Sequence, residues 1–155
     1  IGAGGKSGML CCYEAKKRAG VTGKVIGITH SKRSTDRLIA LDFCDHVFSA
    51  DATQPVSVLE KIEELTGAQL ADVTINNVNI PDTEMTSILI TKDTGVGYFF
   101  SMATSFTKAA LGAEGVGSDV TMIVGNGYTR GHAEITLELL RESEKLRNIF
   151  TELYA

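Results

Sequence analysis

The chain has 155 residues, of which 43% are hydrophobic and 22% are charged. These proportions are close to the globular average and exclude a disordered chain, a collagen and a coiled coil. The net charge of −4 argues against a surface that binds nucleic acid, and no apolar run is long enough to cross a bilayer. We therefore expect a globular protein with neither a nucleic-acid nor a membrane partner.

Strand-like and helix-like segments alternate along the chain. In chain order, the pattern predicts helix 8–19, strand 24–29, helix 34–41, strand 46–49, helix 55–65, strand 71–76, helix 81–89, strand 97–101, helix 107–111, strand 120–124 and a helical segment over 132–154 with a break near 143. Gly20 and Gly67 are expected to end helices, and Thr53 is expected to cap the helix that begins with Pro55.

This alternation predicts the fold class. Strands that alternate with helices pair in parallel through crossover helices. The predicted strands are nearly all apolar, which is typical of strands that are covered on both faces. We expect an α/β three-layer fold with a mostly parallel sheet, forming one domain over residues 1–155 with a C-terminal helix.

The cysteines and histidines indicate neither a disulfide framework nor a metal site. The three cysteines, Cys11, Cys12 and Cys44, are odd in number, and two of them are adjacent. We expect buried or partly buried thiols in helices, and a cytoplasmic protein. The three histidines are scattered, so no metal ligand set is expected.

A glycine-rich segment lies between Ile1, which we take as the last residue of a strand, and the first predicted helix. Glycines let the backbone approach phosphate groups, and the helix N-terminus supplies N–H donors. The candidate phosphate-binding residues are Gly2, Gly4, Gly5, Lys6, Ser7 and Gly8. The spacing G-x-x-G-x-x-G fits a dinucleotide site, although Ser7 stands where the strict G-x-G-x-x-G pattern requires glycine.

Two alternatives compete with the dinucleotide site. The run Gly5-Lys6-Ser7 fits the end of a P-loop whose first glycine would precede Ile1, and the glycines could also be purely structural. A P-loop protein should have an apolar strand that ends in an aspartate. The strand 71–76 ends in Asn76 instead, which favours the dinucleotide site. We therefore expect the α/β fold to be Rossmann-like and to form a dinucleotide-binding domain over residues 1–155.

The residues after the strands extend this hypothesis, because open α/β sheets bind ligands at the carboxyl ends of their strands. Strand 24–29 is followed by Ser31, Lys32 and Arg33 with no carboxylate. Either these residues hold the 2′-phosphate of NADP, or Ser31 binds a ribose hydroxyl and the two cations are solvated. Asp51 is a candidate either for the adenine amino group or for capping the next helix, and Ala52 lies beside it.

The later strand ends supply the candidates for the nicotinamide half of the cofactor. We expect Asn76, Asn77 and Val78 near the nicotinamide ribose. We expect Ser101, Met102 and Ala103 beside the nicotinamide itself.

Four blocks together resemble the family of L-erythro-3,5-diaminohexanoate dehydrogenase. They are GAGGKSGMLCCYEAKKRAGVTGKVIG (2–27), NNVNIPDTEM (76–85), YFFSMATSFTKAALGAEGVG (98–117) and IVGNGYTRGHAE (123–134). The resemblance implies an NAD(P)-dependent oxidative deamination of a diamino acid to 5-amino-3-oxohexanoate and ammonia. It implies NAD as the cofactor, with NADP left open by the basic 30–33 segment. It also implies a catalytic part ahead of the Rossmann part.

Proton transfer in such a reaction needs a base, and two residues are candidates. Glu84 follows the strand 71–76, and His132 follows the strand 120–124. Their alternatives are compensation of a helix dipole for Glu84 and a helix start or surface position for His132. Thr104, Ser105 and Lys108 are further candidates for contact with the nicotinamide or the substrate. Tyr13 and Lys17, four residues apart, resemble a catalytic pair but lie on the first helix, away from the expected substrate entrance.

Two expectations concern what surrounds the chain. A Rossmann sheet places its first strand at the centre, and this strand would lie before Ile1, so we expect the chain to be the C-terminal part of a protein about twice as long. The apolar strand 120–124, at a sheet edge, is the expected pairing surface of a homodimer. A non-catalytic dinucleotide-binding module stays open as an alternative to an enzyme.

Overall fold

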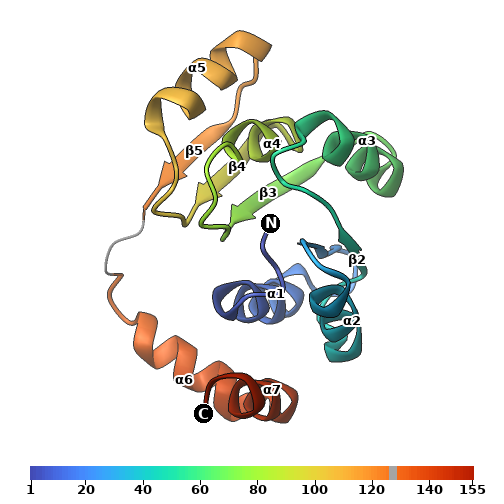
Figure 1. The fold of residues 1–155 in the computed structure, drawn as a ribbon, viewed down its shortest axis with the longest axis vertical. Coiled ribbons are helices and arrows are strands. Elements are labelled where there is room, and N and C mark those ends of the chain that lie inside the picture. The colour runs from blue at the N-terminus through green and yellow to red at the C-terminus, as the bar shows by residue number, and fades with distance from the viewer. Residues whose placement is uncertain (126–128) are drawn as a thin grey trace. The chain divides into compact units, whose positions relative to one another are not determined.

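The computed structural model describes residues 1–125 and 129–155. Its elements are α1 (Lys6–Ala19), β1 (Ile26–Thr29), α2 (Lys32–Leu41), β2 (His46–Ser49), α3 (Pro55–Thr66), β3 (Ala71–Asn76), α4 (Glu84–Leu89), β4 (Thr91–Phe99), α5 (Phe106–Val116), β5 (Thr121–Val124), α6 (His132–Glu142) and α7 (Glu144–Tyr154). The chain divides into two compact units, whose elements apart from β1 are labelled in Figure 1. The β1–β2 unit comprises Gly2–Ser49 and Gly127–Ala155, and the β3–β5 unit comprises Ile1 and Ala50–Asn126.

Among the residues that the structure describes, the β1–β2 unit has two parallel strands and four helices. β1 pairs with β2 from Ile26 opposite His46 to Thr29 opposite Ser49. Helices α6 and α7 pack against α1, and the shared core includes the fully buried Met9, Leu38 and Leu146. Burying side chains of this size supplies most of the stability of such a unit.

In its described part, the β3–β5 unit has three parallel strands in the order β3-β4-β5. Helix α4 packs against α3 and α5, and the buried Ile88, Phe99 and Ala113 form a core between helices and sheet. Ile1 extends the backbone pairing of β3, since its amino group donates to Ile75 O at 2.7 Å. The peptide N–H of Asn77 donates to Ile1 O at 3.0 Å.

The α/β class and the parallel pairing are confirmed, and the predicted break near 143 is also confirmed. Ser143 ends α6, and its hydroxyl accepts from Leu146 N at 3.2 Å, so it caps α7. A serine hydroxyl that accepts from the N–H group three residues further along the chain is a usual N-cap of a helix. In the described part of the chain, no helix combines the length and apolar character needed to cross a membrane.

Some predicted boundaries were wrong. β4 begins at Thr91 rather than at 97, and Thr91 pairs with Ala71 of β3. The prediction missed this start because the polar run 92–94 has no strand pattern. Helix α5 continues past 111 to Val116, through two glycines that weaken the helical signal. Helix α4 begins at Glu84 rather than at 81, after a turn in which Asp82 has a φ of 67°.

Two smaller predictions also need correction. The N-cap of α3 is Gln54 rather than Thr53, although Pro55 occupies the first turn as expected. The Thr53 hydroxyl donates instead to Asp51 Oδ1 at 2.7 Å. Cys44 lies in the loop between α2 and β2 and not in a helix, whereas Cys12 is buried in α1 as predicted. A mutual hydrogen bond raises the pKa of the Cys44 thiol and lowers that of Cys12.

Candidate functional site

The glycine loop of the β1–β2 unit is held beside β1 by its backbone. The N–H groups of Gly2 and Ala3 both donate to Ile28 O at 3.0 Å. Helix α1 then begins at Lys6, and its N-cap, Gly5, provides no side-chain hydrogen bond. The first N–H groups of α1 therefore have no side-chain acceptor at the cap. A helix N-terminus of this kind favours an anionic ligand such as a phosphate.

Two close approaches explain why this loop needs glycine. A Cβ at Gly8 would lie 2.2 Å from Gly2 O and 2.7 Å from Ala3 Cα, both of which are backbone atoms. A Cβ at Gly4 would lie 2.6 Å from Ser34 Cβ, at the start of α2. The loop is therefore packed tightly against its own helix and against α2, which brings the predicted glycine-loop and Ser31–Arg33 candidates together.

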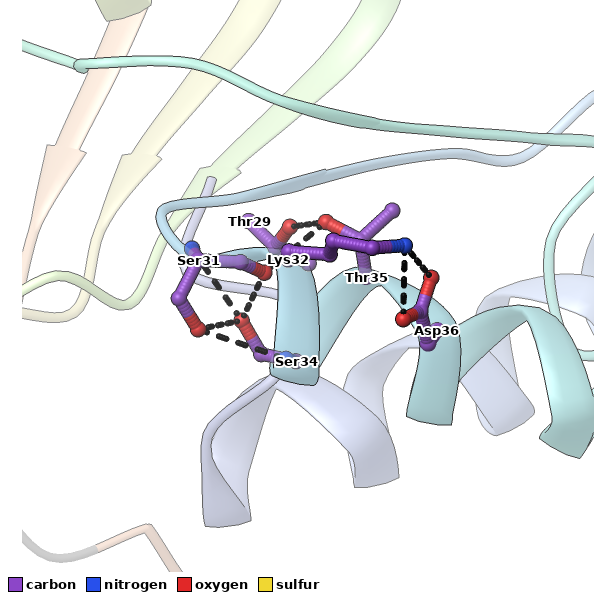
Figure 2. A network of polar contacts seen from close by, with 6 residues as sticks. All are labelled: Thr29, Ser31, Lys32, Ser34, Thr35 and Asp36. Carbon is purple, nitrogen blue, oxygen red and sulfur yellow. Dashed lines mark hydrogen bonds and ion pairs between the residues drawn. The ribbon is translucent and has the colours of Figure 1, made fainter.

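The turn after β1 is a network of hydroxyl groups, shown in Figure 2. Ser31 is the N-cap of α2, and its hydroxyl accepts from Ser34 N at 3.3 Å, while Ser34 Oγ accepts from Ser31 N at the same distance. Thr29 Oγ1 and Thr35 Oγ1 are 2.5 Å apart. This reciprocal capping fixes the direction in which α2 leaves the strand.

The two cations of this turn differ in their partners. Lys32 Nζ is 3.0 Å from Asp36 Oδ2, four residues along α2, so its charge is balanced locally (Figure 2). Arg33 is exposed, and its side chain makes neither a hydrogen bond nor an ion pair with the residues that the structure describes. The guanidinium of Arg33 therefore remains available for an anion.

Lys6 has a different contact within the same unit. Its Nζ lies 4.1 Å from the centroid of the Tyr154 ring, close to the end of α7. An ammonium over an aromatic face is a cation–π contact. The lysine of a P-loop must reach phosphate oxygens, and this lysine is instead placed on a ring.

In the β3–β5 unit, the side chain of Asn76 at the end of β3 faces inward. It is completely buried, and its Nδ2 donates to Thr83 Oγ1 at 2.9 Å and to Ser87 Oγ at 3.0 Å. Its Oδ1 accepts from Val78 N at 3.0 Å. Every polar atom of this amide is engaged, so the amide holds the loop after β3 against α4. Its predicted contact with ribose stays a prediction.

Glu84 and the loop after β4 form the second part of this region. Glu84 is 3% exposed, and its Oε1 accepts from Ser105 N at 2.6 Å. Within the loop, Ser101 Oγ accepts from Ala103 N at 3.1 Å, and Met102 is 81% exposed. Lys108 pairs with Asp82, which raises the pKa of the Lys108 ammonium, and Glu84 adds a smaller attraction.

A hollow of about 350 Å³ lies between the starts of α4 and α5. Its lining residues are Asp82, Glu84, Met85, Thr107, Lys108 and Leu111. This hollow brings two of the candidates, Glu84 and Lys108, to one surface of the unit. Among the described residues, no cluster of three or more histidine, cysteine, aspartate or glutamate side chains is arranged to hold a metal ion.

The turn after β2 is closed by Asp51. Its Oδ1 accepts from Thr53 N at 2.9 Å, so it forms a local turn and does not cap α3. The carbonyl of Ala52 accepts from Thr86 Oγ1 at 2.7 Å, which joins this turn to α4. Neither Thr86 nor the Thr83–Ser87 pair was among the predicted residues. The hydroxyl-rich run 83–87, which follows the loop after β3, was the available signal.

The remaining candidates lie in the β1–β2 unit. His132 is the first residue of α6, it is exposed, and its Nδ1 lies 2.8 Å from Thr129 O. Because a carbonyl only accepts, Nδ1 carries the proton and Nε2 faces away from this bond. Lys17 Nζ is bonded to Glu142 at 2.6 Å, which ties α1 to α6 and agrees with a structural role for Tyr13 and Lys17. Residues 126–128 of the last resemblance block lie outside the described residues.

Comparison with known proteins was made over the whole chain. No protein-family model matches. The chain is 56% identical over 154 residues to L-erythro-3,5-diaminohexanoate dehydrogenase of Acetoanaerobium sticklandii, and 57% identical over 154 residues to that of Fusobacterium nucleatum. Each match covers 99% of this chain and 45% of the relative, so the chain spans less than half the length of these curated relatives.

Solved structures show the fold. A protein named AibC superposes with a TM-score of 0.65 at 17% identity, over 94% of this chain and 38% of its own. A mycobacterial quinone oxidoreductase has a TM-score of 0.62 at 15% identity, over 97% and 44% of the two chains. D-arabinose dehydrogenase of Sulfolobus solfataricus has a TM-score of 0.57 at 18% identity, over 88% and 40%. These neighbours confirm a Rossmann-like fold, and the curated relatives confirm that the chain is similar over 99% of its length to L-erythro-3,5-diaminohexanoate dehydrogenase.

Proposed function

We propose that this chain is the nicotinamide-dinucleotide-binding part of an enzyme that oxidatively deaminates L-erythro-3,5-diaminohexanoate. The observation that carries the proposal is the identity of 56–57% to two dehydrogenases of this name over 99% of the chain. At such identity, related chains share their fold and the placement of their site residues. The products would be 5-amino-3-oxohexanoate and ammonia.

The glycine loop supports a dinucleotide on physical grounds. Its backbone approaches α1 closely at Gly8, and the N-terminus of α1 has no side-chain cap. The close approach holds the loop against the helix, and the missing cap leaves helix N–H donors for a pyrophosphate. The cofactor, when bound, accepts a hydride from the carbon that carries the 3-amino group.

The chain's own residues then have four tasks. The N-terminus of α1 binds the pyrophosphate, and the turn with Ser31 and Arg33 binds the adenosine ribose. The loop 101–103 after β4 borders the nicotinamide, and the loop 76–78 borders its ribose. Of the two candidates for accepting a proton from the substrate, His132 keeps that role in this proposal, with its Nδ1 donating to Thr129 O at 2.8 Å. Glu84, whose Oε1 accepts from Ser105 N at 2.6 Å, is placed to hold the loop after β4.

The choice between NAD and NADP depends on Arg33 in this proposal. No carboxylate follows β1 to accept from a ribose 2′-hydroxyl, whereas Arg33 is unpaired among the described residues. Lys32 is balanced by Asp36 at 3.0 Å and contributes less. We therefore infer that the site accepts both dinucleotides and that Arg33 favours the phosphorylated one.

The P-loop alternative has less support. Lys6 lies on the Tyr154 ring at 4.1 Å, and both curated relatives are named as dehydrogenases. A nucleoside-triphosphatase would show magnesium-dependent ATP binding that is lost in Lys6→Ala. We expect no such binding.

Titration of the purified chain with NADH and NADPH, followed by fluorescence, tests the proposal. We expect saturable binding of at least one of them at sub-millimolar concentration. Absence of binding at millimolar concentration of both would reject it. Binding without turnover, when the chain is tested with the substrate as part of a full-length enzyme, would favour a non-catalytic module instead.

We also propose a homodimer that pairs through β5. This strand lies at the end of the three-stranded sheet, and Ile123 on it is 46% exposed. An unpaired edge with an apolar side chain is a surface on which a second copy can add a strand. Sedimentation of the chain and of Ile123→Lys tests this: we expect a dimer that the lysine dissociates.

A further inference from the structure

The loop between β4 and α5 owes its shape to its own hydrogen bonds. Ser101 Oγ accepts from Ala103 N at 3.1 Å, and Ser101 O accepts from Thr104 N at 3.3 Å. Met102 between them is 81% exposed, so its side chain does not anchor the loop. A short exposed loop keeps one conformation only if its C-terminal end, here Ser105, is also bonded to the rest of the unit.

Glu84 supplies that attachment. Its Oε1 accepts from the peptide N–H of Ser105 at 2.6 Å, and Glu84 itself is 3% exposed. The Ser105 hydroxyl is already used, because it accepts from Lys108 N at 3.3 Å as the N-cap of α5. The loop is therefore fixed to α5 by Ser105 and to α4 by Glu84.

The base on which Glu84 stands is itself rigid. Ser87 Oγ donates to Thr83 O at 3.0 Å and accepts from the buried amide of Asn76. Thr86 Oγ1 donates to Ala52 O at 2.7 Å. These bonds hold α4 against the end of β3 and against the turn after β2, so Glu84 is held in place through several buried contacts.

We propose that Glu84 is a positioning residue, which fixes the loop 101–105 in the conformation that receives the nicotinamide. The inference rests on the proposed dinucleotide site, and it assigns Glu84 a role through Ser105 N–H rather than a role as the base. Binding of the nicotinamide end of the cofactor should then depend on the hydrogen bond and not on the charge of Glu84. Binding of the adenosine end should not depend on it.

Two substitutions separate these possibilities. Glu84→Gln keeps a carbonyl oxygen that can accept from Ser105 N, whereas Glu84→Ala removes the acceptor. The matched control is Glu60→Ala, which removes an exposed carboxyl group from α3 in the same unit. The affinities for NADH, NADPH and ADP-ribose are measured on the 155-residue chain, with amide hydrogen exchange of peptides that cover residues 100–106.

For Glu84→Ala we expect at least about tenfold weaker binding of the dinucleotide that binds the unsubstituted chain, unchanged binding of ADP-ribose and faster exchange over 100–106. For Glu84→Gln and Glu60→Ala we expect values within about twofold of the original chain. Equal losses for NADH and ADP-ribose, unchanged exchange in Glu84→Ala, or a Glu84→Gln as weak as Glu84→Ala would each overturn the inference.

The failure of the proposed function gives a different result. If the unsubstituted chain binds neither dinucleotide, the dinucleotide site is rejected and with it the purpose assigned to the loop. The exchange measurement still reports whether Glu84 anchors the loop. If ADP-ribose binding is lost only in variants of the glycine loop, the dinucleotide site is supported. The comparison of Glu84→Ala with Glu84→Gln then decides the role of Glu84.

Discussion

The glycine loop of the β1–β2 unit and the loops after β3 and β4 in the β3–β5 unit use polar groups in opposite ways. At the glycine loop, the N-terminus of α1 has no side-chain cap, and the exposed Arg33 guanidinium has no side-chain partner among the described residues. After β3, the Asn76 amide and the Thr83 and Ser87 hydroxyls are buried and bonded to one another. A polar residue at a strand end therefore either binds a ligand or shapes the loop, and burial distinguishes the two.

The largest expected effect comes from the close approach at Gly8. In Gly8→Ala the new Cβ would lie 2.2 Å from Gly2 O, and backbone must move to make room. We expect the free energy of unfolding to fall by about 3 kcal/mol, with loss of dinucleotide binding. The measurement is urea unfolding with a parallel titration of NADH.

Gly115→Ala is the matched control, because a Cβ at Gly115 in α5 would meet no atom within 4 Å apart from its chain neighbours and the nearby backbone of its own helix. Alanine at this helical position should raise stability by about 0.5–1 kcal/mol. A Gly8→Ala chain as stable as the original one would show that the loop does not pack as described.

Asn76 provides the next largest effect, in the other unit. Asn76→Ala leaves Val78 N, Thr83 and Ser87 without their shared partner in a buried position. We expect a loss of about 2–3 kcal/mol in unfolding free energy, measured by urea unfolding. The exposed Asn148→Ala should change stability by less than about 0.5 kcal/mol.

A different outcome would reverse the comparison between the two regions. If Asn76→Ala kept its stability but lost NADH binding, Asn76 would be a ligand contact of the kind first expected from its place after a strand. Structural burial would then be a poor guide to the role of these loops.

These cases show what the amino-acid pattern could and could not predict. The periodicity of apolar and polar residues was enough to predict the α/β class and most helices, because the type of an element is recorded in its local pattern. The glycine spacing predicted a tight turn before the first helix, which the structure has ahead of α1, while the binding of phosphate there stays a prediction. The start of β4 could not be predicted, because residues 92–94 are polar and show no strand pattern. The pairing of β4 with β3 is made by backbone groups, which leave no pattern in the side chains.

The roles of Asn76 and Glu84 lay beyond the pattern for another reason. Both follow a strand, as ligand-binding residues do, and their types suit ribose contacts and proton transfer. Their inward direction is set by partners 7 to 21 residues away, namely Thr83 for Asn76 and Ser105 for Glu84. Sequence spacing alone does not say which of these groups meet.

Arg33 gives a smaller effect, on binding rather than on folding. Arg33→Ala removes the cation that is unpaired among the described residues. We expect the affinity for NADPH to fall about tenfold and the affinity for NADH to change by less than about twofold. Lys32→Ala is the control, since Asp36 already balances Lys32 at 3.0 Å. Equal weakening of both dinucleotides by Arg33→Ala would exclude a contact with the 2′-phosphate.

The smallest effect compares one surface ion pair in each unit. Lys16 lowers the pKa of Asp45, which also accepts from Val25 N at 2.7 Å, and Lys92 lowers the pKa of Asp72. The Asp72 side chain is 82% exposed and that of Asp45 is 30% exposed. We therefore expect Asp45→Asn to cost more stability than Asp72→Asn at pH 7, and each to cost less than about 1 kcal/mol.

The pH dependence of these costs follows from the direction of the pKa shifts. A carboxyl group whose pKa is lower in the folded than in the unfolded chain contributes stability above the unfolded pKa of about 3.9. That contribution is lost as the pH falls through the folded value. Urea unfolding should therefore show a constant cost of Asp45→Asn above about pH 5, which shrinks below about pH 4 and is reduced by salt. A cost that grew on acidification would mean that Asp45 is not stabilised as a carboxylate by Lys16.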